Sequence, residues 1–346
     1  MHLAVYVLRR LAYMLVALFG VSLIAFVVTR VLPGNPAYMI VGVMADETTV
    51  AAVTERLGLD LPIHEQYFRY IQQLASGDLG DSWRTRNPVT TDIGARWPAT
   101  IELGTTALIL ALAWSVPFGI ISALRRRSIS DRLANFISGL GVSIPEFWLG
   151  LILLLFFFGA KEWAPAPIRP LLEWAPAPIG RTLGSPPAHT TGLFTVDAVL
   201  ARDWEAFRAA AHQLILPATT LALVVGAPLL RVTRGFMRET MSSHHIRSAR
   251  ALGVPERSIV LRHALPNVLL PVSTMVAIMY GYLLGGTVLV EFVFAWPGIG
   301  KYAIDSISAS DFAPVLAAVL LSALSYLVVY LVMDILHFMI DPRTRT

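Results

Sequence analysis

The chain contains no cysteine and few charged residues. Because cysteine is absent from all 346 residues, disulfide scaffolds and zinc–thiolate sites are excluded. Charged residues make up 14% of the sequence, whereas soluble domains average about 25%, so the chain cannot cover an ordinary water-exposed surface. Hydrophobic residues make up 55% and the mean hydropathy is +0.64, which excludes a disordered chain and argues against a soluble enzyme.

The sequence contains long runs of uncharged, mostly apolar residues. A membrane-spanning helix needs about 20 mostly apolar residues, and six segments between charged residues approach or exceed that length. The segments are residues 11–29, 103–124, 133–160, 213–230, 263–290 and 312–333. The third contains one carboxylate, Glu146. The sequence therefore predicts an all-α polytopic membrane protein with six transmembrane helices.

The arginines predict the orientation of these helices. Six crossings place both termini on one side, and arginines gather in four of the regions that then share a side. These clusters are Arg9–Arg10, Arg125–Arg132, Arg234–Arg262 and Arg343–Arg345. The positive-inside rule assigns them, and both termini, to the cytoplasm. We therefore expect a first transmembrane helix in residues 1–30, a small extracellular cap in 31–99, and a core domain in 100–346 that holds the other five helices.

Two of the segments predicted to be extracellular contain identifiable features. In the cap, Glu47–Leu57 and Glu65–Leu74 are predicted helices and Gly77–Gly80 is a predicted turn. In the extracellular insert, residues 161–211, the seven residues Glu162–Ile168 recur as Glu173–Ile179. Their alternating Ala-Pro favours an extended chain. The repeat is either a duplicated spacer or a docking surface for an external partner.

The cytoplasmic loop at 231–266 carries the most information. A polar helix is predicted from Arg234 to Leu252, ended by Gly253, and a second short helix after Pro255, closed by Pro266. Three interpretations compete: a solvated basic loop, a DNA-binding helix-turn-helix, and a protein-docking element. The tether between two membrane spans argues against nucleic acid. The docking element would present its arginines to an acidic partner protein.

This loop resembles the EAA loop of ATP-binding-cassette importer permeases. Ala249, Gly253 and the pair Leu265-Pro266 carry the resemblance, whereas Arg247 occupies the acidic position and His263 replaces an isoleucine, as in the peptide-type subfamily. Further resemblances are in Leu8–Leu11, Leu32–Pro36, Leu57–Pro62, Gln66-Tyr67, Gly77–Gly80, Pro98–Thr100, Glu291–Gly300, Asp311 and Asp341–Arg343. The chain is thus similar to the B-type permease subunit of a dipeptide or oligopeptide importer. The implied coupling residues are Arg247, Ala249, Gly253, Glu256, Leu265 and Pro266.

The resemblance implies a set of partners in a bacterial inner membrane. A second homologous permease would complete the pore, an external solute-binding protein would deliver peptide, and two cytoplasmic ATPase subunits or domains would hold ATP and magnesium. This chain itself would bind no cofactor and would not be an enzyme. Gly300-Lys301 superficially suggests a phosphate-binding loop, but Ala295 and Tyr302 stand where that motif needs Gly and Ser or Thr.

Candidate residues of the substrate pathway lie inside the spans. A charge at the bilayer centre costs at least about 2.5 kcal/mol, so Glu146 is either a pore carboxylate or a carboxylate bonded to a neighbouring helix. Gly281, Gly285 and Gly286 permit close helix approach, within the chain or at the seam with the partner permease. The alternatives are a secondary transporter acting alone, or an importer of this family for nickel complexes or glutathione. The adjacent His244-His245 pair lacks the further ligands that a metal site needs.

Overall fold

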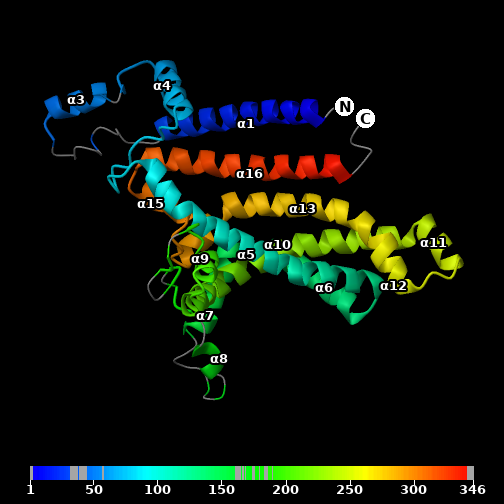
Figure 1. The fold of residues 1–346 in the computed structure, drawn as a ribbon. Helices are drawn as coiled ribbons and strands as arrows, with labels where there is room; N and C mark the ends of the chain where they lie inside the picture. Colours follow the sequence, from blue (N-terminus) through cyan, green and yellow to red (C-terminus); the bar gives the residue numbers. More distant parts are fainter. Residues whose placement is uncertain are drawn as a thin grey trace.

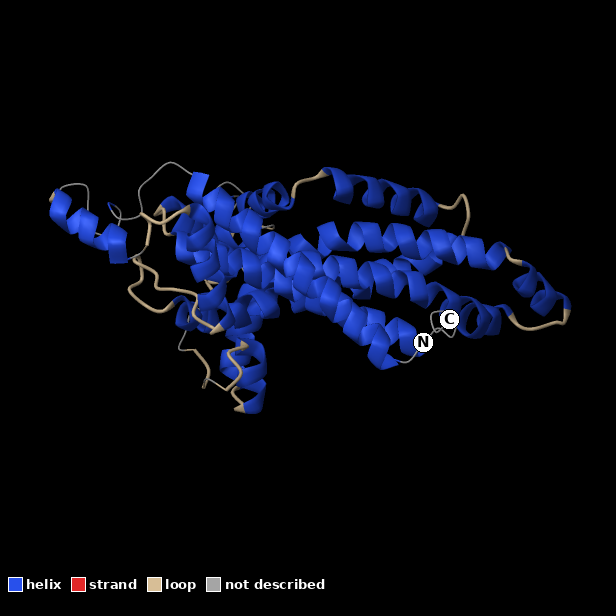
Figure 2. Cartoon of the chain, turned by 90° about the horizontal axis from the view of Figure 1, so that it is seen from above, coloured by secondary structure: helices blue, strands red, loops and turns tan. Residues whose placement is uncertain are grey.

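The computed structural model describes most of the chain as helix joined by short connections (Figure 2). The described residues are 3–31, 38, 45–56, 58–159, 165, 167, 169–173, 176–178, 180–182, 186–188 and 190–340. Most of the predicted Trp-Ala-Pro duplication lies outside these ranges, as do residues 341–346. Within them the structure contains no strand beyond one isolated bridge between Asp81 and Pro88.

Five long helices form the bundle, and they are long and apolar enough to cross a membrane (Figure 1). They are α1 (Leu3–Val31), α5 (Val89–Leu124), α10 (Trp204–Ser242), α13 (Leu265–Gly286), extended backwards to Glu256, and α16 (Phe312–Ile340). With a sixth, bent pair of helices, they account for the six apolar segments of the sequence. The prediction of an all-α polytopic membrane protein is confirmed.

The third predicted span, residues 133–160, is not one straight helix. It is a pair, α6 (Ile129–Ser143) and α7 (Glu146–Phe157), bent by 105°. Pro145 has no backbone N–H and forces the preceding residue out of the helical region, and Ile144 accordingly has φ −90° and ψ 122°. We refer to Ile144-Pro145 and the two helices as the elbow. Its second arm, α7, leaves the bundle (Figure 1).

Helix α10 lies at the centre of the molecule. In its most apolar stretch 72% of residues are buried, against 11% in the peripheral α1. Small residues allow the neighbouring helices to approach α10 closely. A Cβ added to Gly226 would lie 2.3 Å from the ring of Trp114, and one added to Gly119 would lie 2.9 Å from Thr233. The packing of α5 on α10 therefore depends on glycine at these two positions.

The peripheral helix α1 is attached at both ends. Near one end, Arg10 forms an ion pair of 3.0 Å with Asp334 of α16. Near the other, the Ser22 and Tyr67 hydroxyls lie 2.8 Å apart, and Phe26 stacks on Tyr70. Both tyrosines belong to α4 (Ile63–Ala75), which follows α3 (Glu47–Arg56). These two helices lie where the sequence predicts helices, and Gly77 and Gly80 have the positive φ (80° and 79°) of a turn.

The other connections at this end contain short helices. They are α8 (Arg169–Glu173), α9 (Phe194–Leu200), α14 (Val288–Val293) and α15 (Ile299–Ser308). The loop before α9 is organised by the buried carboxylate of Asp197. It accepts hydrogen bonds from the backbone N–H groups of Thr190 (3.3 Å), Thr191 (2.7 Å) and Gly192 (2.9 Å).

The opposite end of the bundle holds the loop singled out in the sequence. It consists of α11 (His244–Ala251), α12 (Glu256–Ser258) and the π-helix η2 (Ile259–Ala264), which runs into α13. The first residue of α1 and the last of α16 lie at this same end (Figure 1). The two ends of the described chain therefore share a side with α11, as six crossings require.

Candidate functional site

The docking element predicted at residues 231–266 is a short helix between two long ones. Helix α10 runs to Ser242, and α11 starts after one extended residue, Ser243 (φ −70°, ψ 159°). The predicted single helix from Arg234 to Leu252 is therefore wrong, because the chain turns at Ser243. The Ser243 hydroxyl donates to the Thr240 carbonyl at 2.6 Å, a local bond that competes with helix continuation.

Gly253 ends α11, as predicted. Its φ of +77° lies in the left-handed region that residues with a Cβ rarely adopt. The Gly253 N–H donates to the Arg250 carbonyl at 3.1 Å, and the next N–H, of Val254, donates to Ala249 at 3.2 Å. No atom lies within 4 Å of a Cβ added at Gly253. The requirement for glycine here is thus one of backbone conformation, and the space around it is open.

One face of α11 is fixed to the bundle. Ile246 is fully buried, and it belongs to an apolar cluster with Met237 of α10, Ile259 of η2 and Val268 of α13. Ala249 of α11, one of the predicted coupling residues, packs against the same cluster. A short helix held in this way moves together with α10 and α13, because displacing Ile246 alone would expose its apolar surface to water.

The other face of α11 is exposed. Arg247 lies on it, Arg250 is exposed as well but extends toward α12, and the residue before Gly253 is Leu252, which is 84% exposed. A leucine so exposed at the tip of a rigid turn is a ready contact for a partner protein. Leu252 is not among the coupling residues predicted from the sequence. Its only signal there was an apolar residue immediately before the helix-ending glycine.

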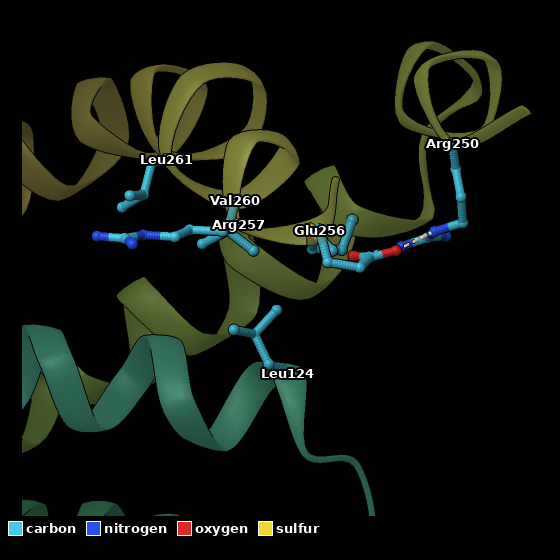
Figure 3. A pocket seen from close by; sticks show the side chains of 7 residues that line it. Leu124, Arg250, Glu256, Arg257, Val260 and Leu261 are labelled. Carbon is cyan, nitrogen blue, oxygen red and sulfur yellow. Dashed lines mark hydrogen bonds and ion pairs between the residues drawn. The ribbon is translucent and has the colours of Figure 1, made fainter. Parts of the chain in front are cut away.

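Arg250 and Glu256 join the two arms of the loop across Gly253. Arg250 donates from Nε and Nη2 to the two carboxylate oxygens of Glu256, at 2.5 and 3.2 Å. The pair closes one side of a cavity of about 630 Å³ (Figure 3). Figure 3 shows Arg250 and Glu256 extending toward each other, with Arg257 beneath Leu261 on the opposite side. Because the pair is exposed, it contributes little to folding stability, but it orients α11 relative to α12.

Pro266 does not close the second helix, contrary to prediction. Residues Glu256–Gly286 form one continuous helical span of 31 residues. The π-helix η2 makes this possible: the Leu265 N–H bonds to the carbonyl of Val260, five residues back. The wider turn accommodates a proline that has no N–H and would otherwise clash with the preceding turn. Leu265 and Pro266 are thus inside the rod that connects the loop to α13.

A row of arginines on α10 holds the first arm of the elbow. Arg234 donates to Asp131 of α6 from Nε (2.9 Å) and Nη2 (2.6 Å), and Arg238 donates to the same carboxylate oxygen. Arg231 donates to the Ser138 carbonyl at 2.9 Å. We call these three residues the arginine row. In the sequence Arg234 and Arg238 counted as positive charges that mark the cytoplasmic side, and no pairing was predicted for any of the three.

Glu146 lies at the start of the second arm. It is buried, and Tyr282 of α13 donates a hydrogen bond of 2.9 Å to its Oε2. This contact fits the interpretation of Glu146 as a carboxylate bonded to a neighbouring helix. A role of Glu146 in the substrate pathway stays a prediction.

The three predicted pathway glycines face side chains of this chain. A Cβ on Gly281 would lie 2.4 Å from the Tyr326 ring of α16, and one on Gly285 would lie 3.4 Å from Ser322. Gly286 lies against the ring of Tyr282. They therefore allow α13 to pack on α16 and on itself, and their role in the substrate pathway stays a prediction.

Two buried acids that were not among the predicted site residues organise the end of the bundle opposite α11. Glu291 of α14 accepts from the Thr100 hydroxyl at 2.7 Å and from the Lys301 N–H at 3.1 Å, and burial raises the pKa of this carboxyl. Glu102 of α5 forms a buried ion pair with Arg181 of the insert. Among the described residues, no three His, Asp or Glu side chains come together as a metal site would require.

Comparison with known proteins gives matches over nearly the whole chain. Residues 115–346 match the family model described as binding-protein-dependent transport system inner membrane component. Residues 3–104 match the model for the N-terminal part of such membrane components.

Three relatives illustrate the similarity. The chain is 40% identical to the probable D,D-dipeptide transport system permease protein DdpB of Escherichia coli, over 94% of this chain and 92% of that protein. It is 37% identical to the di/tripeptide transport system permease protein DppB of Pseudomonas aeruginosa, over 98% of both chains. It is 35% identical to the glutathione transport system permease protein GsiC of Salmonella paratyphi A, again over 98% of both.

Proposed function

The chain belongs to the family of binding-protein-dependent transport system inner membrane components, and from this premise we propose how it works. It forms half of a transmembrane pore, and a second, homologous permease forms the other half. An external solute-binding protein delivers short peptides to the pore. Two ATPase subunits or domains, which carry ATP and magnesium, bind to the loop that contains α11.

The observation that carries this proposal is the construction of α11. One face is held by the buried Ile246, the opposite face offers Arg247 and Leu252, and both ends continue into long helices of the bundle. A partner that changes shape while gripping such an element must move α10 and α13 with it. Only contacts that differ between two states of the partner can drive such a change, and a stiff docking helix transmits them.

The arginines support an orientation with α11 and both termini in the cytoplasm. The charged residues at that end include Arg9, Arg10, Arg250 and Arg257, and the positive-inside rule assigns them to the cytoplasmic face of the inner membrane. In this orientation α3 and α4 belong to an extracellular cap and α9 to an extracellular insert.

The proposed cargo is a short peptide. Relatives that are 35–40% identical over nearly the whole chain are named as permeases for dipeptides, di- and tripeptides and glutathione. Since glutathione is itself a small peptide, all three describe one class of substrate. Glu146 then has two possible roles, contact with the ammonium end of a passing peptide or structural support of the elbow through Tyr282.

The proposal is tested by purification and transport. The chain, expressed with the genes that neighbour its own, should copurify with a second permease and with ATPase subunits. Proteoliposomes containing this complex should accumulate a labelled dipeptide when the binding protein and ATP are supplied. Accumulation that persists without ATPase subunits, driven by an ion gradient, would instead identify a secondary transporter and overturn the proposal.

A further inference from the structure

The second helix of the cap, α4, packs against the side of a membrane span and not beyond its end. The Tyr67 hydroxyl lies 2.8 Å from the Ser22 hydroxyl, and the Tyr67 ring lies edge-on to Phe19, with 5.9 Å between the ring centroids. Tyr70 stacks on Phe26 at 5.7 Å. All these contacts fall on the stretch of α1 that is long and apolar enough to cross a membrane. Helix α4 therefore reaches into the depth of the bilayer.

The contacted residues of α1 give the depth of α4. Arg10 and Arg30 are 20 positions apart, and α1 carries no charged residue between them. At about 1.5 Å per residue this stretch is about 30 Å long, the thickness of the hydrocarbon core. Phe26 and Ser22 precede Arg30 by 4 and 8 positions, so they lie about 6 and 12 Å inside that boundary. An amphipathic helix in a membrane interface buries its apolar face about 5–10 Å deep, which matches the level at which α4 meets α1.

The order of the contacts shows which side of α4 faces the membrane interior. Helix α4 runs across α1 at the end of the bundle opposite α11 (Figure 1). Tyr67 contacts α1 as deep as Phe19, whereas Tyr70 contacts it at Phe26, nearer the end of the span. A turn about the α4 axis from Tyr70 to Tyr67 therefore leads toward the membrane interior.

The inward side of α4 is apolar and exposed. Each residue of an α-helix is rotated by about 100° from the one before, so the same turn continued past Tyr67 leads to Ile71 and then to Phe68. Phe68 is 63% exposed, and Ala75 beside it is exposed as well. The one polar residue on this side, His64, lies in the first turn of α4, and its ring can keep its polar edge at the membrane surface. In water this apolar side would stay uncovered, whereas lipid acyl chains would cover it.

The opposite side of α4 is polar. Arg69 and Gln73 lie on it and are exposed. Gln66, on the same side, donates from Nε2 to the carbonyls of Leu59 and Leu61 at 3.2 and 2.7 Å. The turn that precedes α4 therefore covers this side. Because lipid cannot satisfy the backbone groups of an irregular turn, this side faces away from the hydrocarbon core.

We propose that α4 is an interfacial helix, which lies in the membrane leaflet opposite α11 with Phe68 among the lipid acyl chains. The partner of this surface is the bilayer, because the surface continues the exposed apolar surface of a membrane span. Beside the contacted face of α1, Leu23 and Val27 are 40% and 41% exposed, and only 11% of the most apolar stretch of α1 is buried. The predicted extracellular cap is thus seated in the membrane through its second helix. This inference goes beyond the proposed function and needs only that α1 crosses the membrane.

The test measures the depth of spin labels in the assembled transporter in liposomes. Because the chain has no native cysteine, Phe68→Cys and Gln73→Cys can each be labelled selectively alongside cysteine-free partner subunits. Both positions are exposed and lie on opposite sides of one helix, so Gln73→Cys is the matched control. For each label the collision rate is measured with oxygen, which concentrates among acyl chains, and with a nickel chelate, which stays in water.

The label at position 68 should collide with oxygen and be shielded from the nickel chelate. The label at position 73 should show the reverse, so the ratio of oxygen to nickel collisions should be several-fold higher at position 68. Free access of the nickel chelate to position 68 would show that this side of α4 lies in water. Shielding of position 68 from both reagents would show that another protein surface covers it. Either result would overturn the inference.

A second labelling site and the transport assay keep the test decisive. Should the complex with Phe68→Cys fail to assemble, Ala75→Cys places the label on the same side of α4, two turns further on, with the same expected and contrary results. The depth of a label is read without transport. A wild-type complex without ATP-driven uptake would therefore refute the proposed function alone, whereas a water-exposed label at position 68 would refute the interfacial helix alone.

Discussion

Replacement of Gly253 should weaken ATPase binding without unfolding the permease. Gly253 has φ +77°, and no atom lies within 4 Å of an added Cβ, so the cost of a side chain is conformational. The left-handed region costs an ordinary L-residue about 1–2 kcal/mol. The loop can avoid this cost by leaving the docking conformation, and the apparent affinity falls with the competent fraction. Since 1.4 kcal/mol is a factor of ten, Gly253→Ala should weaken ATPase binding about 5- to 30-fold.

Different side chains at position 253 should have graded effects. Gly253→Asn should have the smallest effect, because asparagine tolerates the left-handed region, and the β-branched Gly253→Val the largest. The assay titrates purified ATPase subunits onto the permease in lipid nanodiscs and measures peptide uptake in parallel. We expect Gly253→Val, and likewise Gly253→Pro, whose ring cannot adopt a positive φ, to abolish uptake.

Gly77 provides the matched control. It has φ +80°, equally open surroundings and an exposed position, but it lies at the opposite end of the molecule, after α4. Gly77→Val should therefore lower the melting temperature about as much as Gly253→Val and leave ATPase affinity unchanged. The reasoning is refuted if Gly253→Val retains wild-type uptake, or if Gly77→Val weakens ATPase binding to the same extent.

Three further predictions concern other parts of the molecule. Leu252→Asp should weaken ATPase binding in the same titration, whereas Phe68→Asp, a similarly exposed residue of the cap, should not; equal loss would show that Leu252 is not a contact. Glu146→Gln should reduce uptake of cationic peptides selectively if the carboxylate meets substrate, and equal loss for all peptides in competition assays would favour the structural role. Burial raises the pKa of Asp197, but hydrogen bonds from Thr191, Thr190 and Gly192 outweigh this effect and lower the pKa below its usual value of 3.8. The charged carboxylate therefore stabilises the fold above about pH 4, and this contribution is lost as the pH falls and the group is protonated. Asp197→Asn should accordingly lower the melting temperature at neutral pH, with the difference shrinking on acidification; a difference independent of pH would contradict this.

The sequence predicts the fold where a local rule has no competitor. Charge-free runs of sufficient length identify the spans, because no other environment tolerates so many of them. The end of α11 at Gly253 follows from the preference of helix C-termini for a left-handed glycine. In both cases the signal lies within a few residues of the feature, and the rest of the fold does not override it.

The two prolines show where local rules fail. Pro266 was expected to end a helix, but one wide π-turn absorbs it and the rod continues. Pro145 lies inside residues 133–160, which were predicted to form one span, and the span bends by 105° there. The effect of a proline depends on whether neighbouring helices hold both sides in line, and a single sequence does not contain that information.

The polar contacts that organise the site could not be predicted from the sequence, for a different reason. Asp131 and Arg234 are 103 positions apart, and Glu146 and Tyr282 are 136 apart. In the sequence the arginines satisfy the positive-inside rule completely, so nothing indicates that some of them also pair with a buried acid. Such pairings follow from the packing of α6 and α13 against their neighbours and become visible only with the structure.

The unbroken course of α10 has a consequence for communication across the membrane. The same helix starts beside α9, where Asp203 caps it, and ends at the turn into α11. Linkage between two binding sites is reciprocal. If occupancy of one site raises the affinity of the other, occupancy of the second raises the affinity of the first by the same factor. In the proposed function, a binding protein that docks at the end of α10 near Trp204 and an ATPase that docks beyond Ser242 would therefore act on one conformational equilibrium. Binding of the loaded binding protein at one end of α10 and binding of ATP to the ATPases at the other would then favour the same conformation of the permease.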